Sequence, residues 1–275
     1  MSAQQKLSQG LTQRGPLCIG LDPDPQRLPR CVRGDIAAFL RDIIAATSDL
    51  ACAYKINSAF FESLGIDEGA VLAAVRKAIP DAALFIWDGK RGDIGNTNRH
   101  YAHAAFEVLG ADAVTVHPYL GLTPLEPFFR YRDRLTFVLC ATSEGSQMQD
   151  LCIQDAAVGG RPLALWQWVA CEVARIDQGQ CGLVVGATQP DRLAWVRKTA
   201  PQLPLLLPGV GAQGGQIPAQ DASAPLLINA SRSILYASPD DDFAMAARNA
   251  AAKLRDDCHR FAATESNPPR QAEVA

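Results

Sequence analysis

The sequence lacks any apolar run that approaches the roughly 18 residues a membrane span needs. Its first fifteen residues are polar and contain no apolar core of the kind that a secretory signal peptide has. The formal charge of −3 at pH 7 provides no overall positive field, so we do not expect charge-driven binding to nucleic acid or to an anionic membrane. These absences predict a cytoplasmic protein that holds any anionic ligand by local groups.

Paired metal-binding cysteines are also missing. None of the eight cysteines belongs to a CxxC pair, and several, such as Cys18 and Cys140, lie within apolar runs. Such cysteines are typical of reduced core residues, so we expect neither a disulfide framework nor a zinc framework. No GxxxxGK[ST] motif occurs, and a P-loop for nucleotide phosphates therefore has no support.

Short runs rich in valine, isoleucine and leucine recur about every 30 residues, separated by segments long enough for a helix. This spacing is typical of the βα repeat. The eight candidate strands are 17–22, 51–57, 84–90, 113–118, 136–143, 182–188, 204–210 and 225–231.

Eight strands in continuous alternation with helices predict an α/β fold, a (β/α)8 TIM barrel, as a single domain over residues 1–264. An open doubly wound sheet is the alternative, but closure of the barrel leaves no edge strand. The tail over 265–275 has two prolines and few apolar residues, which predicts disorder.

Helices are expected between the strands, and Asp35, Asp67 and Thr97 are short oxygen-bearing residues suited to helix starts. The expected helices include 35–46, 67–78, 97–109, 162–176 and 190–198. The segment 144–160 is longer than a usual βα loop. It is either a mobile element near the site or an insertion with no catalytic part.

The most informative stretch is IWDGKRGDIGNT, over 86–97 at the end of the third predicted strand. Alternation places Asp88 and Lys90 on one face of that strand, and barrel active sites form at the C-terminal strand ends. An isolated pair of this kind is more often a satisfied ion pair. Here Lys55 and Asp22 end the two preceding strands, so four charged residues meet at one mouth. Burial of such charges is costly without a function, which predicts a catalytic site.

These residues resemble the bacterial orotidine 5′-phosphate decarboxylase family. The matching motifs are DxKRGDIGxT at 88–97, GLDP at 20–23 and YKIN at 54–57, followed in order by ADAVTV at 111–116, PYLG at 118–121, PGVGAQGG at 208–215 and SRS at 231–233. The resemblance runs from about Pro16 to Ala237. It implies decarboxylation of orotidine 5′-monophosphate to UMP and CO2, the final step of de novo pyrimidine nucleotide synthesis, without a metal or organic cofactor.

The resemblance also implies catalytic roles for single residues. Asp88, Lys90 and Asp93 match the charged catalytic motif of the family, and Lys55 matches the lysine that completes the network and contacts the ribose. Asp93 and Thr97 match residues that act across a dimer interface in the neighbouring site. We therefore expect a homodimer.

Substrate-binding roles follow from the same resemblance. Asp22 matches the aspartate that holds the ribose hydroxyls, and Ser143 falls where a serine contacts the pyrimidine. Gln213 and Arg232 match the phosphate-binding residues. Ser231 stands where many relatives have glycine, and a serine can still donate its backbone N–H to a phosphate.

The chemistry explains why a lysine between carboxylates is needed. Loss of CO2 from C6 of orotate leaves an anion that the ring cannot readily delocalise, so the protein must supply electrostatic stabilisation and a proton. Neighbouring negative charge favours the ammonium form of a lysine, and we therefore expect Lys90 to donate a proton to C6. A Schiff-base aldolase needs a neutral lysine, and the flanking aspartates argue against it.

Two other patterns allow different sites. The stretch GVGAQG at 209–214 fits GxGxxG, but it follows the seventh predicted strand and no acidic residue is placed to bind a ribose, so it is a weak dinucleotide signature. His100, His103 and His117 suggest a metal site, but no carboxylate completes it, and solvent-facing or capping histidines are favoured. Whether His117 lines the site stays open.

Two rival functions remain. A magnesium-dependent sugar-phosphate lyase or decarboxylase of the same superfamily would share the DxKxxD core but need further acidic metal ligands at the strand ends. Glu62 lies beyond the second strand, and no clear ligand set appears. A non-catalytic nucleotide-phosphate-binding protein on a decayed scaffold is the other rival. The intact charged set argues against it.

Overall fold

Eight parallel strands close into one barrel. The computed structural model describes residues 1–65, 68–143, 147–154, 160, 162–210 and 225–264. Around the barrel the strand order is β1, β10, β9, β8, β5, β4, β3 and β2. The bounds are β1 (Leu17–Gly20), β2 (Ala53–Asn57), β3 (Leu84–Arg91), β4 (Ala113–Val116), β5 (Leu135–Ala141), β8 (Cys181–Val185), β9 (Leu205–Pro208) and β10 (Leu226–Ala230). Each strand lies inside its predicted run or within one residue of it, and the predicted TIM barrel is confirmed.

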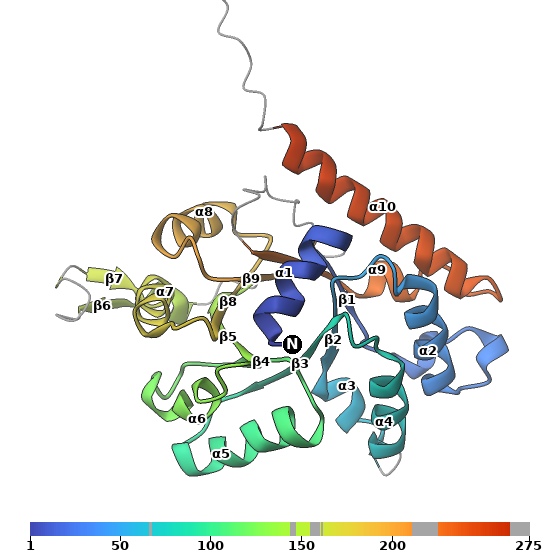
Figure 1. Ribbon diagram of the computed structural model, residues 1–275, viewed down its shortest axis with the longest axis horizontal. Helices are drawn as coiled ribbons and strands as arrows, with labels where there is room; N and C mark the ends of the chain where they lie inside the picture. Colours follow the sequence, from blue (N-terminus) through green and yellow to red (C-terminus); the bar gives the residue numbers. More distant parts are fainter. Residues whose placement is uncertain (66–67, 144–146, 155–159, 161, 211–224, 265–275) are drawn as a thin grey trace, which may run out of the picture.

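Helices surround the barrel on its outside, and the longest, α10, follows the last strand (Figure 1). They are α1 (Ala3–Arg14), α2 (Ile36–Thr47), α3 (Ser58–Glu62), α4 (Glu68–Ala78), α5 (Gly95–His103), α6 (Glu126–Phe129), α7 (Leu165–Ile176), α8 (Pro190–Thr199), α9 (Arg232–Leu235) and α10 (Phe243–Thr264). Short 3-10 turns lie at Pro25–Arg27, Arg30–Val32, Thr123–Leu125 and Gln147–Asp150, and a π-helical turn at Ala104–Val108 follows α5.

The predicted helix starts are partly confirmed. Asp35 caps α2, since its carboxylate accepts the backbone N–H of Ala38 at 2.8 Å. The predicted start at Thr97 is wrong because α5 begins at Gly95, where the Asp93 carboxylate accepts the N–H of Ile94. Asp67 lies outside the described residues.

The predicted helix start at 162 is also wrong. Residues Pro162–Ala164 form a short strand, β7, which pairs in antiparallel fashion with β6 (Cys152–Gln154), and helix α7 begins only at Leu165. This two-stranded hairpin stands apart from the barrel (Figure 1). It belongs to the long segment after β5, of which 144–146 and 155–159 lie outside the described residues.

Alternation along each strand divides the core into two regions. Outward side chains such as Leu17, Ile19 and Tyr54 pack against the helices. Inward side chains fill the barrel with small and branched apolar groups, which is how barrels of this kind are packed. The inward set is Cys18, Ala53, Leu84, Ile86, Ala113, Leu135, Phe137, Val184, Leu206 and Leu227.

Helix α1 closes the N-terminal end of the barrel. Its residues Ala3 and Leu7 are buried in the same cluster as the inward side chains of the strands. Ser2 and Gln5 form a capping box at its start, with the Ser2 N–H donating to Gln5 Oε1 at 2.9 Å. In Figure 1 the helix lies across the barrel in this view. Helix α1 therefore covers the apolar interior of the barrel at its N-terminal end.

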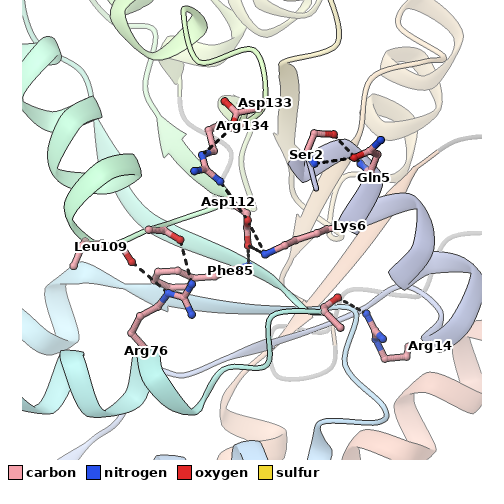
Figure 2. A network of polar contacts seen from close by, with 12 residues as sticks. Ser2, Gln5, Lys6, Arg14, Arg76, Phe85, Leu109, Asp112, Asp133 and Arg134 are labelled. Atoms are coloured by element: carbon pink, nitrogen blue, oxygen red, sulfur yellow. Dashed lines mark hydrogen bonds and ion pairs between the residues drawn. The ribbon is translucent and has the colours of Figure 1, made fainter.

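Asp112 anchors α1 to the barrel (Figure 2). This aspartate precedes β4 and is only 2% exposed. Its carboxylate accepts hydrogen bonds from Lys6 Nζ of α1 at 3.0 Å and from the backbone N–H of Phe85 at 2.9 Å. Arg134 lies 3.6 Å from the same carboxylate. One buried carboxylate thus joins α1, β3 and the start of β5.

All eight cysteines are free in the structure. Five of them are buried, as predicted, namely Cys18, Cys52, Cys140, Cys181 and Cys258. Cys31 and Cys152 are exposed, which their sequence context did not indicate. Within the described residues, no helix combines the length and the apolar character needed to cross a membrane.

The contacts of Asp112 predict its contribution to stability. Replacement Asp112→Ala leaves the Phe85 N–H and the Lys6 ammonium without their acceptor, so we expect the free energy of unfolding to fall by about 2–4 kcal/mol. Urea denaturation followed by circular dichroism measures this change. Asp133→Ala is the matched control, because the Asp133 side chain is 64% exposed and 3.7 Å from Arg134. That control should change the stability by less than about 0.5 kcal/mol, and equal losses in both variants would contradict the role of Asp112.

Candidate active site

A polar layer caps the apolar interior of the barrel. Ala53, Ile86 and Ala113 point into the barrel from β2, β3 and β4. The next residue to point inward on each of these strands, two positions further along, is polar. The alternation of the strands therefore aims these side chains at the barrel mouth. They are Lys55 on β2, Asp88 on β3 and Thr115 on β4, and Asn229 holds the equivalent place on β10.

These residues form the floor of a cavity of about 510 Å³. Its opposite wall is apolar. The apolar lining comprises Leu139, Val184, Leu206, Pro208 and Val210. A cavity of this size suits a small ligand that has one flat, weakly polar part and one strongly polar part.

Four charged groups form a ladder along the cavity. Lys90 Nζ lies 2.6 Å from Asp88 Oδ1, Lys55 Nζ lies 2.7 Å from Asp88 Oδ2, and Lys55 Nζ lies 3.9 Å from Asp22 Oδ1. Lys55 and Asp88 are buried, with 5% and 6% exposure. The Lys90 side chain is 46% exposed and faces the cavity from its rim. The structure thus brings together the four charged residues that the sequence places at the barrel mouth.

The ladder keeps its buried members ionised. Burial alone would raise the pKa of the Asp88 carboxyl, but Lys55 and Lys90 hold it well below its usual range. Burial would likewise lower the pKa of Lys55, but Asp22 and Asp88 raise it above the ordinary value. Each of these two groups is therefore charged near neutral pH because its partners are charged.

Lys90 lies in an unusual backbone conformation. Its φ is +45°, in the left-handed region that residues other than glycine seldom occupy. The pairing of β3 with β4 is irregular between Trp87 and Arg91, so the strand bulges at this point. Lys90 is held in place by its surroundings, and such strained residues are concentrated at functional sites.

One of the two predicted phosphate-binding residues, Arg232, belongs to the cavity lining. Arg232, at the start of α9, lines the cavity and is exposed. Its neighbour Ser231 packs against Gly20, where a Cβ would lie 2.7 Å from Ser231 Cβ and 3.0 Å from Asp22 Oδ2. Gly20 is therefore needed for this close approach. Gln213 lies outside the described residues.

Asp22 sits between the two ends of the cavity. Its Oδ1 accepts the N–H of Asn57 at 3.2 Å, and both residues line the cavity. The β1 and β2 ends are thereby joined at the cavity wall.

Ser143 lies beside the cavity rather than in its described lining. Its hydroxyl donates to the carbonyl of Pro208 at 3.4 Å, and its own carbonyl accepts the Thr188 hydroxyl at 2.9 Å. Pro208 belongs to the cavity wall. Ser143 therefore contacts the cavity wall through Pro208 but is not among the described lining residues.

Asp93 and Thr97 lie away from the cavity of their own chain, as far as the described residues show. Asp93 is locked at the start of α5, since the Asn98 side chain bonds both its N–H and its carbonyl. Beside it are exposed apolar side chains, with Ile94 61% and Tyr119 73% exposed. Both side chains are open to solvent in the single chain.

The histidines occupy peripheral positions. His100 and His103 are exposed on α5. His117 is half-buried. Its backbone N–H donates to the Arg91 carbonyl at 2.9 Å, and its ring packs against Gly92. In the part of the chain that the structure describes, His117 is not among the cavity-lining residues, and no group of three His, Cys, Asp or Glu side chains forms a metal site.

Several cavity residues were missed by sequence reasoning. Thr115 donates to Asp88 Oδ1 at 2.7 Å from the floor of the cavity. Arg27 and Tyr236 line the rim, with the guanidinium 4.0 Å from the centre of the tyrosine ring. Thr115 lies inside the ADAVTV motif, and strand alternation from Ala113 could have placed it in the barrel. Arg27 and Tyr236 are 209 positions apart in the sequence, and the sequence pattern offered no signal that they are in contact.

Comparisons with known proteins agree with this geometry. The chain matches the Orotidine 5′-phosphate decarboxylase / HUMPS family over residues 15–247. It is 47% identical over 273 residues to an orotidine 5′-phosphate decarboxylase of Thermomicrobium roseum, which covers 95% of this chain and 96% of that protein.

Solved structures show the same likeness. The chain is similar to an OMP decarboxylase of Leishmania donovani, with 35% identity and a TM-score of 0.79 over 95% of this chain and 99% of that chain. It is also similar to a UMP synthase of the same organism, with 36% identity and a TM-score of 0.81 over 95% of this chain. The chain spans 56% of that UMP synthase.

Asp88 makes the stability of the protein depend on pH. Its pKa in the folded state is below the ordinary value of 3.8. The ionised carboxylate therefore stabilises the folded state fully above about pH 4, and this contribution is lost as the pH falls below about 4 toward the lower pKa of the folded state. We expect the difference in unfolding free energy between wild type and Asp88→Asn to be large at about pH 6 and smaller at about pH 3 in urea titrations.

Asp81→Asn is the matched control for this measurement. Asp81 is an exposed carboxylate in the turn before β3, and its replacement should leave the unfolding free energy close to that of the wild type at both pH values. A difference between wild type and Asp88→Asn that stays constant across the pH range would contradict the effect of Asp88 ionisation.

Proposed function

This chain belongs to the Orotidine 5′-phosphate decarboxylase / HUMPS family, and on that basis we propose that its cavity binds orotidine 5′-monophosphate and that Lys90 protonates C6 as CO2 leaves. The chain catalyses decarboxylation of orotidine 5′-monophosphate to UMP, a carboxy-lyase reaction of pyrimidine nucleotide biosynthesis. The observation that carries the mechanism is the ladder of Lys90, Asp88, Lys55 and Asp22 at the barrel mouth.

The ladder supplies what the reaction needs. Departure of CO2 leaves an electron pair at C6 that the pyrimidine ring does not delocalise, and a fixed positive charge beside C6 stabilises it. Lys90 is the one member of the ladder whose side chain is about half exposed, and Asp88 holds its ammonium group at 2.6 Å. In the proposed step, an N–H bond of Lys90 breaks and a C–H bond forms at C6 with the electron pair left by CO2.

The remaining ligand groups match the rest of the cavity. We assign the ribose to Lys55 and Asp22, which both line the cavity, and the apolar wall suits the face of a pyrimidine ring. We assign the phosphate to Arg232, whose guanidinium offers charge-assisted hydrogen bonds, together with Gln213. Ser143 is assigned to the pyrimidine edge. Binding energy from the phosphate, far from the reacting bond, contributes to the rate by orienting the ring.

We further propose that the enzyme is a homodimer in which Asp93 and Thr97 complete the neighbouring site. The support is that both residues lie outside the described cavity lining, although they follow the charged motif directly. The exposed apolar side chains of Ile94, Tyr119 and Leu120 lie at the same end of the barrel. Their burial would contribute to the stability of the dimer.

The proposal includes no metal and no organic cofactor, since the charges and the proton come from side chains. It places the enzyme in the cytoplasm, where its free cysteines stay reduced. It treats 1–264 as one catalytic domain, and the predicted tail over 265–275 lies outside the described residues. An assay of CO2 release from orotidine 5′-monophosphate in the presence of EDTA tests the activity and the need for a metal together. Loss of activity that added magnesium restores would favour the magnesium-dependent lyase class.

Lys90→Ala should remove the proton donor and one charge of the ladder. We expect kcat/KM for orotidine 5′-monophosphate to fall by about 10⁴-fold or more, because general acid catalysis and electrostatic stabilisation are lost together. Steady-state kinetics measures the change, and circular dichroism checks the fold. Lys77→Ala, which removes an exposed lysine of α4, is the matched control and should retain full activity. Activity of Lys90→Ala near that of the control would refute the role of Lys90.

Mixed dimers test the action of Asp93 across the interface. Each single variant, Lys90→Ala or Asp93→Ala, should be nearly inactive alone. After subunit exchange at equal amounts, about half of the dimers are hybrids, each with one intact site, so about one quarter of the wild-type activity should return. If the mixture stays inactive although hybrids are detected by native mass spectrometry, Asp93 acts within its own chain.

A further inference from the structure

We propose that Thr115 is a positioning residue for the decarboxylation, because its hydroxyl joins the backbone of Lys90 to the carboxylate of Asp88. The inference rests on the proposed function, since it concerns the geometry of the proton donor. Thr115 does not belong to the charged motif and was not among the residues predicted from the sequence. Its assignment comes from three contacts that the fold creates.

The first observation is the bulge in β3. Trp87 pairs with Val114 and Arg91 pairs with Val116, so three residues of β3 face a single residue of β4. That single residue is Thr115. The bulge contains both Asp88 and Lys90, and it turns the lysine into the left-handed conformation with φ +45°. An irregular strand of this kind requires a partner for its displaced backbone groups.

The second observation is the hydrogen bonding of the Thr115 hydroxyl. The backbone N–H of Lys90 donates to Thr115 Oγ1 at 3.0 Å, in place of a carbonyl of β4. The hydroxyl in turn donates to Asp88 Oδ1 at 2.7 Å. The hydroxyl therefore uses its single proton for the hydrogen bond to the Asp88 carboxylate, and one of its lone pairs accepts the N–H of the Lys90 backbone. Because Thr115 is 2% exposed, water does not substitute easily for either bond.

The third observation is that the same carboxylate oxygen holds the lysine ammonium. Asp88 Oδ1 accepts both the Thr115 hydroxyl and Lys90 Nζ, the latter at 2.6 Å. Lys90 is thus fixed at two points, its backbone and its ammonium group, and both points lead to the Thr115 hydroxyl. The arrangement closes a ring of hydrogen bonds through Asp88, Thr115 and Lys90. A ring of this kind limits the movement of Nζ relative to the cavity.

Loss of the hydroxyl opens this ring. The Lys90 N–H would be left without an acceptor, so the bulge would relax toward a conformation that turns the lysine away from its present direction. Asp88 would keep its contacts with the two lysines but lose the bond that fixes the plane of its carboxylate. Misplacement of a catalytic group by about 1 Å is enough to reduce a rate by about 10²-fold. The effect should fall on the chemical step rather than on substrate binding.

The test compares Thr115→Val with Thr115→Ser in the full-length enzyme. Valine keeps the shape of the side chain and removes the hydroxyl, whereas serine keeps the hydroxyl. We expect Thr115→Val to lower kcat for orotidine 5′-monophosphate by about 10²-fold and to change the Kd of UMP by less than about threefold. Thr115→Ser should restore kcat to within about fivefold of the wild type. Fluorescence or calorimetric titration with UMP gives the Kd.

Thr136→Val is the matched control. Thr136 is also a buried threonine of the barrel, 1% exposed on β5, but it lies near the N-terminal end of its strand and outside the cavity lining. Its replacement should leave kcat within about twofold of the wild type. A general sensitivity of the barrel to loss of a buried hydroxyl would appear in this control as well.

Three outcomes would overturn the proposal. Thr115→Val could retain kcat within about threefold of the wild type, or it could lose kcat and UMP affinity by similar factors, which indicates a general structural role. If Thr115→Val does not fold, Thr115→Ala is measured in the same way. Failure of both variants to fold would likewise assign Thr115 a purely structural role. A wild-type enzyme that released no CO2 would instead refute the proposed function, independently of Thr115.

Discussion

The Asp88 carboxylate is the group on which the geometry of the site depends. It is buried at the top of an apolar barrel interior, where an unpaired charge would be strongly unfavourable. Two ammonium groups and one hydroxyl surround its two oxygens, at 2.6–2.7 Å. Each partner is held by a different strand, so the directions of β2, β3 and β4 determine where the positive charges lie. A catalytic array of this kind is preorganised because its buried charges, Lys55 and Asp88, hold each other and their partners in fixed directions.

The same interior also explains why the site is at one end of the barrel. Small and branched apolar side chains fill the lower layers, and α1 covers the N-terminal end with Ala3 and Leu7. Asp112 binds Lys6 of that helix, so a second buried carboxylate stabilises the closed end. The packed interior and the closed N-terminal end therefore make the barrel a rigid support for the site. The mouth above it accommodates the strained Lys90, and a non-glycine residue in this conformation costs roughly 1–2 kcal/mol.

Much of this arrangement could be predicted from local patterns. The strands were predicted because buried parallel strands appear as continuous apolar runs, and Asp35 was recognised as a helix cap because its contacts are local. Local patterns were insufficient where distant contacts decide the structure. Pro162 enters a strand because β6 is available to pair with it. At α5 the deciding contact is local but was missed, since the Asn98 side chain holds the backbone of Asp93 five residues earlier and the helix starts before Thr97. Helix α1 has a capping box in Ser2 and Gln5, a local signal that the sequence analysis did not use.

The sequence by itself determined the repeat of strands and helices, the charged residues at the ends of the first three strands and the resemblance of their motifs to a decarboxylase family. These features depend on periodicity and residue type, which adjacent residues carry. Only the tertiary structure decided that Lys90 bends back to Asp88 through a bulge, that Thr115 holds both residues, and that Arg27 and Arg232 line the same rim. Thr115 reaches Asp88 and Lys90 through the pairing of β3 with β4, and closure of the barrel between β1 and β10 brings Arg27 and Arg232 to one cavity although they are far apart in the chain.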